Sequence, residues 1–105
     1  MFAIKPGVRI TKLQPPMIVA WGIVAECYKS YGCDCTITSG EDSKHGVNTL
    51  HTEGFALDFR SWSVPRPVIM DLLTKIRCCL GEDSDVILEK MNMTGEHIHV
   101  EYDPA

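Results

Sequence analysis

The sequence lacks several features that define large functional classes. No apolar run in its 105 residues is long enough to span a bilayer, so we expect no membrane insertion. No charged segment leads into an apolar core and a small-residue cleavage site, so we expect no signal peptide and a cytoplasmic location when the chain is made. The net charge of −4 argues against nucleic-acid binding, which needs clustered Lys and Arg.

Internal repeats, low-complexity tracts and linkers are also absent. A chain of 105 residues fits one small domain, so we expect residues 1–105 to fold as a single unit. Hydrophobic residues make up 45% of the chain, which is enough to form a buried core.

The usual cysteine spacing of a zinc finger is missing too. The five cysteines form one C-x-C pair, one C-C pair and a single residue: Cys33 and Cys35, Cys78 and Cys79, and Cys27. An odd count without a signal peptide favours reduced thiols that serve as small core or surface residues. A disulfide or a second metal site is the alternative.

Hydrophobic periodicity predicts two helices among several short strands. Pro15 and Pro16 open the first helix, and Gly32 ends it. The second helix has Asp71 near its start and Arg77 near its end, as the helix dipole favours. Each helix is expected to bury a stripe of residues at helical spacing: Met17, Ala20, Trp21, Val24, Tyr28 and Tyr31 on the first, and Ile69, Leu72, Leu73, Ile76 and Leu80 on the second. The expected elements are a strand at 8–12, a helix at 15–31, strands at 33–38 and 51–60, a helix at 67–80, and strands at 85–89 and 97–102.

These elements predict an α+β fold, a small and mostly antiparallel sheet with helices packed on one face. Alternation in "HTEGFALDFR" places Phe55, Leu57 and Phe59 on the core face, with Gly54, Ala56 and Asp58 on the other. In "HIHVEY", alternation places Ile98, Val100 and Tyr102 in the core and His97, His99 and Glu101 on the opposite face. Two strands therefore present polar residues on the face without helices, where the small residues before Asp58 leave room for a ligand.

Imidazole and carboxylate groups on neighbouring strands suit Zn²⁺. A catalytic zinc site usually has three protein ligands, and His51, Asp58 and one histidine of "HIH" would supply them. Glu96 stands three residues before His99 and could act as the general base. Each motif alone has another interpretation: "HIH" as an exposed strand face, and "HxxGxAxD" as a tight strand entry. Their combination favours the metal site.

The motifs "HTEGFALD" and "GEHIHVEYD" resemble the S-x-H-x-x-G-x-A-x-D and E/D-x-x-H elements of the Hedgehog/D-Ala-D-Ala-peptidase superfamily. This superfamily includes zinc D-Ala-D-Ala carboxypeptidases, D-Ala-D-Ala dipeptidases, phage L-alanyl-D-glutamate endolysins and the Hedgehog signalling domain. The resemblance covers residues 37–103 and implies a Hedgehog/DD-peptidase-like fold.

The resemblance also implies roles for individual residues. It makes His51, Asp58 and His99 the zinc ligands and Glu96 the general base. His97 would bind substrate or stabilise an oxyanion, and a role as a fourth zinc ligand is the less favoured alternative. Glu89 competes with Glu96 as the base, because in the Hedgehog branch the pocket glutamate lies farther upstream of the last histidine.

Two positions depart from the superfamily pattern. Thr49 replaces the usual Ser before the first histidine, and Asp42 stands where many active members have the Arg of S-G-Y-R. His45, in the same loop, is expected to enter the pocket and contact substrate. Arg60, Arg66 and Lys44 are candidates for the missing positive charge, and each is otherwise a surface residue.

The sequence-based expectation is a zinc-dependent peptidase that hydrolyses amide bonds in peptidoglycan stem peptides. It would be of the DD-carboxypeptidase or LD-endopeptidase type, phage encoded, monomeric and active on the cell wall, with a peptidoglycan peptide as its partner. The alternative is a non-catalytic zinc-binding module of the same fold, either Hedgehog-like or a structural part of a virion.

Overall fold

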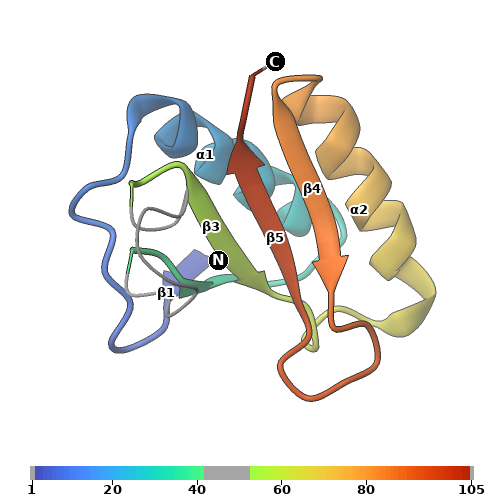
Figure 1. The fold of residues 1–105 in the computed structure, drawn as a ribbon. Helices are drawn as coiled ribbons and strands as arrows, with labels where there is room; N and C mark the ends of the chain where they lie inside the picture. Colours follow the sequence, from blue (N-terminus) through green and yellow to red (C-terminus); the bar gives the residue numbers. More distant parts are fainter. Residues whose placement is uncertain (1, 42–52, 105) are drawn as a thin grey trace.

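A twisted sheet forms the centre of the protein, and two helices pack on one of its faces (Figure 1). The computed structural model describes residues 2–41 and 53–104. Within them the elements are β1 (Phe2–Ile4), α1 (Pro15–Ser30), β2 (Cys35–Ser39), β3 (Ala56–Arg60), α2 (Arg66–Leu80), β4 (Ser84–Glu89) and β5 (His97–Tyr102).

The strands lie in the order β1-β2-β3-β5-β4. β1 pairs with β2 in parallel, while the β2–β3, β3–β5 and β5–β4 pairs are antiparallel. This arrangement confirms the α+β prediction with helices on one face of a mostly antiparallel sheet. It also places β5, with its two histidines, between β3 and β4.

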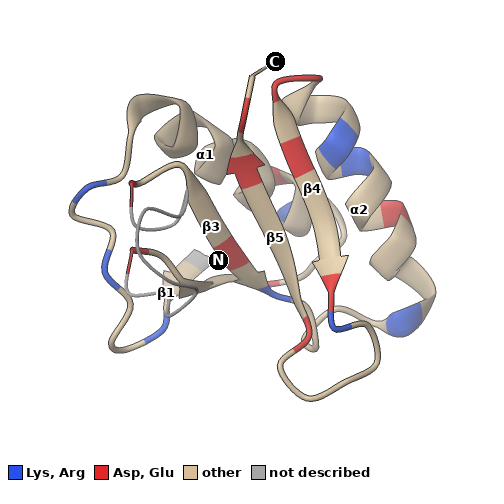
Figure 2. Cartoon of the chain, in the orientation of Figure 1, with Lys and Arg blue, Asp and Glu red and all other residues tan. Residues whose placement is uncertain are grey.

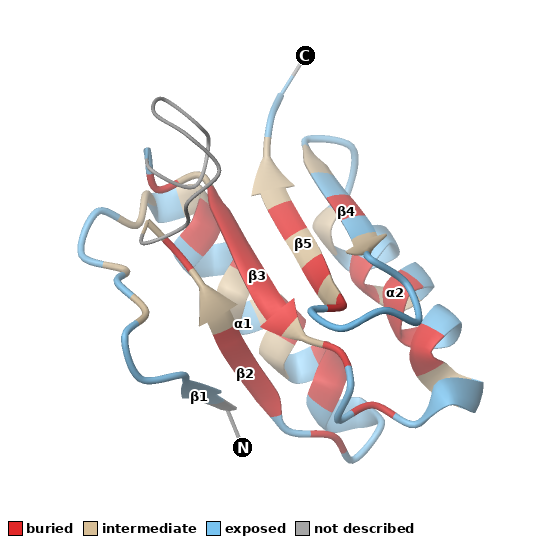
Figure 3. Cartoon of the chain, turned by 60° about the horizontal axis from the view of Figure 1, so that its bottom comes forward, coloured by how far each residue is buried: buried red, intermediate tan, exposed pale blue. Residues whose placement is uncertain are grey.

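The core lies between the sheet and the helices, as the burial pattern in Figure 3 shows. Leu57 and Phe59 of β3 and Ile98 of β5 are fully buried there, which confirms the predicted alternation. The helix stripes are confirmed in most positions, and the buried helix residues are Met17, Ala20, Val24, Cys27, Tyr28, Ile69, Leu72, Leu73 and Ile76. Of the residues expected on these stripes, Trp21 and Leu80 are half-buried and Tyr31 is exposed.

The cysteines are free thiols, three of them in the core and two on the surface of α2. Burial raises the pKa of Cys27 to about 11 and that of Cys35 to about 12. Both thiols are therefore protonated at neutral pH and pack as small apolar groups.

The predicted strand at Val8 to Lys12 is wrong. The edge position beside β2 is taken by β1, and the chain turns away from it at Gly7, whose φ is +90°. The following segment is held by Glu41, which accepts hydrogen bonds from Thr11 Oγ1 at 2.5 Å and from the main-chain N–H of Lys12 at 2.7 Å. These side-chain bonds, together with isolated main-chain bonds such as that from Glu41 N–H to the Arg9 carbonyl at 2.9 Å, hold the segment in place of a strand ladder.

The same segment explains the glycine before β3. A Cβ on Gly54 would lie 2.0 Å from the carbonyl oxygen of Lys12, and the φ of Gly54 is +83°. The main chain also donates a hydrogen bond from Gln14 N–H to the Gly54 carbonyl at 3.0 Å. The space at this glycine is therefore filled by residues 12–14, which corrects the expectation that it serves a ligand.

Neither described helix has an apolar stretch of the length needed to cross a bilayer.

Candidate metal centre

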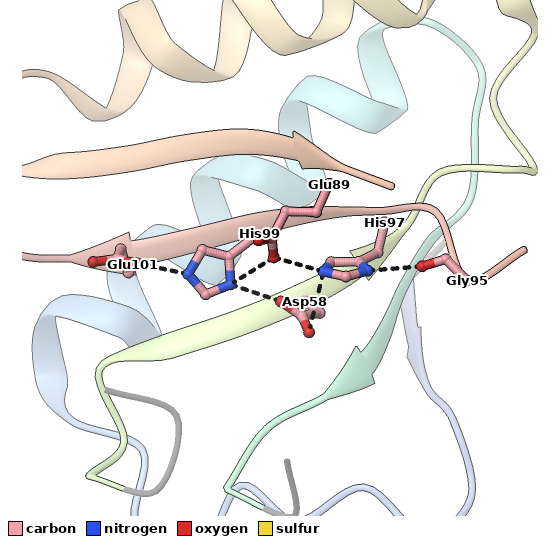
Figure 4. A network of polar contacts seen from close by, with 6 residues as sticks. All are labelled: Asp58, Glu89, Gly95, His97, His99 and Glu101. Carbon is pink, nitrogen blue, oxygen red and sulfur yellow. Dashed lines mark hydrogen bonds and ion pairs between the residues drawn. The ribbon is translucent and has the colours of Figure 1, made fainter. Parts of the chain in front are cut away.

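Four side chains from three neighbouring strands converge on the face of the sheet opposite the helices (Figure 4). They are Asp58 of β3, Glu89 of β4, and His97 and His99 of β5. Sheet register explains the convergence, because Asp58 lies opposite His99 and Glu89 lies opposite His97. One ligand atom from each of the four lies within 4.8 Å of the others, so the cluster could hold a metal ion.

His99 is held between two carboxylates. Its Nδ1 lies 2.8 Å from Asp58 Oδ1, and its Nε2 lies 2.7 Å from Glu101 Oε1. If Nε2 donates to Glu101, the Nδ1 lone pair of the neutral ring is left facing Asp58. A carboxylate that orients a histidine in this way is a common partner of metal-binding imidazoles.

His97 is held by the main chain on one side of its ring. Its Nδ1 lies 2.9 Å from the carbonyl oxygen of Gly95, which can only accept a hydrogen bond, so Nδ1 carries the proton. Its Nε2 then faces the cluster, 2.9 Å from Glu89 Oε1 and 3.5 Å from Asp58 Oδ2. The ring is therefore oriented with its second nitrogen toward the two carboxylates.

The carboxylates also change the titration of His99. Burial of the ring favours its neutral form, but hydrogen bonds to Asp58 and Glu101 outweigh burial and raise the pKa of His99 to about 9. Both ring nitrogens of His99 therefore carry a proton at neutral pH in the metal-free molecule. A metal ion that binds Nδ1 must release the proton there, so metal affinity should rise with pH.

Exposure differs across the cluster. The side chains of Asp58, His97 and His99 are only 5%, 14% and 12% exposed, whereas that of Glu89 is 43% exposed. Asp58, His97 and His99 are therefore shielded from solvent, and Glu89 lies at the exposed edge of the cluster. Two imidazoles and two carboxylates match the donor types that zinc and other divalent transition metals accept.

The sequence-predicted residues are only partly gathered in this cluster. Asp58 and His99 lie together as expected, and His97 joins them, although the sequence placed it as a substrate-binding residue. The predicted ligand His51 and the predicted substrate residue His45 lie outside the described residues.

Glu96, the predicted general base, lies apart from the cluster of described residues. Its carboxylate accepts hydrogen bonds from Ser61 Oγ at 2.6 Å, from Nη1 and Nη2 of Arg66 at 2.9 and 2.8 Å, and from the main-chain N–H of Asn92 at 2.7 Å. The hydrogen bond with Arg66 is the chief reason why the pKa of Glu96 falls to about 2, with further contributions from Ser61 and Asn92 and with burial opposing the shift.

The alternation of β5 already contained the signal for this placement. Residues 96, 98 and 100 share one side of the chain, so Glu96 continues the side of the buried Ile98 and Val100. The spacing of Glu96 before His99 did not reveal this, because spacing along the chain carries no information about the side. The register of the β4–β5 pair instead brings Glu89, the competing candidate, to His97.

Comparisons with protein-family models, with curated proteins and with solved structures find no match to this chain. The superfamily resemblance therefore stays a prediction from the sequence motifs, and the metal cluster rests on the geometry described above.

Proposed function

We propose that this protein is a zinc-dependent peptidase that hydrolyses amide bonds in peptidoglycan stem peptides. The observation that carries the proposal is the convergence of Asp58, Glu89, His97 and His99 on the open face of the sheet. The resemblance of the motifs that contain Asp58 and His99 supplies the substrate class. The cluster's donor types support zinc.

Asp58 and His99 would hold the zinc ion, together with His51 as the resemblance implies. A bound zinc ion would lower the pKa of a water molecule and polarise the carbonyl group of the substrate. Glu101 keeps the ring of His99 in place through Nε2, 2.7 Å away. The low exposure of Asp58 and His99 limits competing water at the ligands.

Glu89 is the proton acceptor in this proposal. Its Oε1 lies 2.9 Å from His97 Nε2 and 3.7 Å from His99 Nδ1, and the half-exposed side chain can reach both solvent and a bound peptide. It would take a proton from the attacking water and pass it to the leaving amine. Glu96 cannot take this role while both of its oxygens accept hydrogen bonds from Ser61, Arg66 and Asn92.

His97 would stabilise charge on the substrate. The Gly95 carbonyl fixes its ring, and Nε2 is presented to the cluster. Because Nδ1 already donates to Gly95, Nε2 carries an N–H only in the imidazolium form, and in that form it could bind the carbonyl oxygen as it becomes negative during attack.

One observation favours a second function, a non-catalytic metal-binding module. Asp58, Glu89, His97 and His99 supply four donors without any residue from elsewhere, and four protein ligands close a tetrahedral zinc site to water. In that arrangement Glu89 is a ligand, and none of the described residues in the cluster is left as a base beside the metal.

Hydrolysis of purified peptidoglycan, followed by the release of new amino groups, separates the two functions. The zinc-loaded protein should release them, a chelator should stop the release, and added zinc should restore it. Glu89→Gln should bind zinc and lower the rate by roughly 10²–10⁴-fold. The matched control is Glu82→Gln, which changes an exposed glutamate after α2.

Activity of Glu89→Gln equal to that of the unaltered protein would rule out Glu89 as the base. A zinc-loaded protein that cuts no peptidoglycan, and whose Glu89→Gln variant has lost its zinc, would instead establish the non-catalytic module.

A further inference from the structure

Arg60 lies beside the metal cluster on the same face of the sheet. It is two residues after Asp58 in β3, so the pleat points both side chains to that face. It also pairs directly with His97 of β5. Side chains in such directly opposed positions have Cβ atoms about 4.5–5.5 Å apart. The β-carbon of Arg60 therefore lies beside that of His97, whose ring contacts Glu89 and Asp58.

Both the main chain and the side chain of Arg60 are held in place. Its carbonyl oxygen accepts a hydrogen bond at 2.7 Å from the hydroxyl of Tyr28, a fully buried residue of α1. Its guanidinium carbon lies 4.6 Å from the centre of the Trp62 ring. The Trp62 side chain is 71% exposed, so this stacked pair lies at the surface rather than in the core. A stacked arginine retains its N–H groups for ligands in the plane of the guanidinium.

The guanidinium group of Arg60 forms no hydrogen bond within the described part of the chain. Its Nε is buried there and has no hydrogen-bond partner. Other arginines differ: Arg66 donates to both oxygens of Glu96, and Arg77 Nε donates to the Val86 carbonyl. A buried unpaired donor is costly, so it calls for a structural or functional explanation.

The charge around Arg60 gives it a further role. Acidic residues lie along β3, β4 and β5, whereas Lys and Arg lie mainly on α2 and the N-terminal segment (Figure 2). On the face that carries the cluster, the described acidic side chains are Asp58, Asp85, Glu89 and Glu101, and Asp103 groups with Asp85 and Glu101 just after β5. Arg60 supplies permanent positive charge there, so an anionic group of a substrate would be favoured beside Arg60 and disfavoured elsewhere on this face.

We propose that Arg60, stacked on Trp62, binds a carboxylate group of the peptide substrate next to the metal cluster. The two terminal nitrogens of the planar guanidinium can each donate an N–H to one oxygen of the same carboxylate. Trp62 forms the apolar wall of the subsite and keeps the guanidinium group of Arg60 in one orientation. This inference rests on the proposed peptidase function for the identity of the ligand as a peptide. Arg60 then determines specificity, because it separates peptides with a free carboxylate from neutral ones.

The test uses metal-free protein, prepared by chelation and exhaustive dialysis, so that no hydrolysis takes place. N-acetyl-D-Ala-D-Ala and its C-terminal carboxamide are titrated separately while the Arg60 Nε–H resonance and the Trp62 indole resonance are followed by NMR. The acid should shift both resonances and bind roughly 10- to 100-fold more tightly than the amide, as expected for charge-assisted hydrogen bonds. Arg60→Gln should remove this preference, and Arg60→Lys should retain part of it.

Lys75→Gln is the matched control, because Lys75 also stacks on an aromatic ring, 5.5 Å from the centre of Tyr31, on the helical side of the molecule. It should leave the preference unchanged. Equal binding of acid and amide, or an unchanged preference in Arg60→Gln with a native amide spectrum, would overturn the subsite.

The two proposals fail separately. A preference for the acid that depends on Arg60, in a protein that cuts no peptidoglycan when loaded with zinc, supports the subsite and removes the peptidase. Cleavage of peptidoglycan without that dependence does the opposite.

Discussion

Replacing Glu96 with Gln should destabilise the protein without removing a group that acts in the reaction. The Glu96 side chain is 6% exposed, and its two oxygens accept four hydrogen bonds from Ser61, Arg66 and Asn92. Gln keeps one oxygen but presents an NH₂ group where a second acceptor is required. At least one donor is then left without a partner, and the charge of Arg66 loses its counter-ion.

The magnitude follows from the burial of each partner. A hydrogen bond to a charged group contributes about 1.5–3 kcal/mol, and leaving a buried donor unpaired costs about 1–3 kcal/mol. The Arg66 side chain is 46% exposed, so water replaces part of its interaction and the lower ends of these ranges apply. We therefore expect a loss of roughly 2–3 kcal/mol in the free energy of unfolding.

Urea denaturation of the metal-free protein at pH 7 measures this loss, with Glu82→Gln as the exposed control. The difference should depend on pH with a defined sign. The pKa of Glu96 falls from 4.5 to about 2 in the folded state, so its stabilisation is complete above pH 4.5 and is lost as the pH falls toward 2. The difference between the unaltered protein and Glu96→Gln should shrink across that range.

Two results would refute this reasoning. The first is a stability change below about 0.5 kcal/mol, the size of an ordinary surface substitution, because it would mean that the four hydrogen bonds contribute little. The second is a fully stable, zinc-loaded Glu96→Gln variant without peptidase activity, because it would return the role of base to Glu96.

Three further predictions concern the metal and the backbone. Zinc at 100 times its dissociation constant should raise the free energy of unfolding by about 2.7 kcal/mol, measured by denaturation with and without a chelator, and no change would contradict a folded-state site. Glu101→Gln should weaken zinc binding by roughly 10–100-fold in a competition titration, because Glu101 orients His99, and unchanged affinity would remove that role. Gly54→Ala should lower the melting temperature, because its Cβ would meet the Lys12 carbonyl. Gly22→Ala, with nothing within 4 Å of its added Cβ, should raise the melting temperature, and equal effects of the two would refute the packing argument.

The helices and the faces of the inner strands could be predicted because they depend on local periodicity. Leu57, Phe59 and Ile98 are buried where alternation placed them, and both helices begin within a residue of the predicted start. The segment from Val8 to Lys12 also alternates, but β1 occupies the only edge of β2 that β3 leaves open. Competition for a sheet edge is decided between distant segments, so periodicity within the segment could not reveal it.

The candidate site shows the same division. Asp58 and the two histidines could be chosen from their residue types and their shared face. The choice between Glu89 and Glu96 could not be made from spacing to His99, because it depends on how the β4–β5 hairpin pairs. Glu89 reaches the cluster through that pairing, while Glu96 turns to the start of α2 and contacts Arg66.

The buried carboxylate of Glu96 also has a consequence for how β5 finds its place in the sheet. A shift of β5 by two residues would keep Ile98 and Val100 on the apolar face, so hydrophobic alternation alone tolerates it. Such a shift would carry Glu96 away from Ser61 and Arg66 and leave a negative charge unpaired inside the protein, at a cost of several kcal/mol. We therefore expect Glu96 to select one pairing among those that the apolar residues allow. Because Glu96 is an ionised group on the core-facing side of the chain, it favours the one strand pairing that aligns both histidines with Asp58 and Glu89.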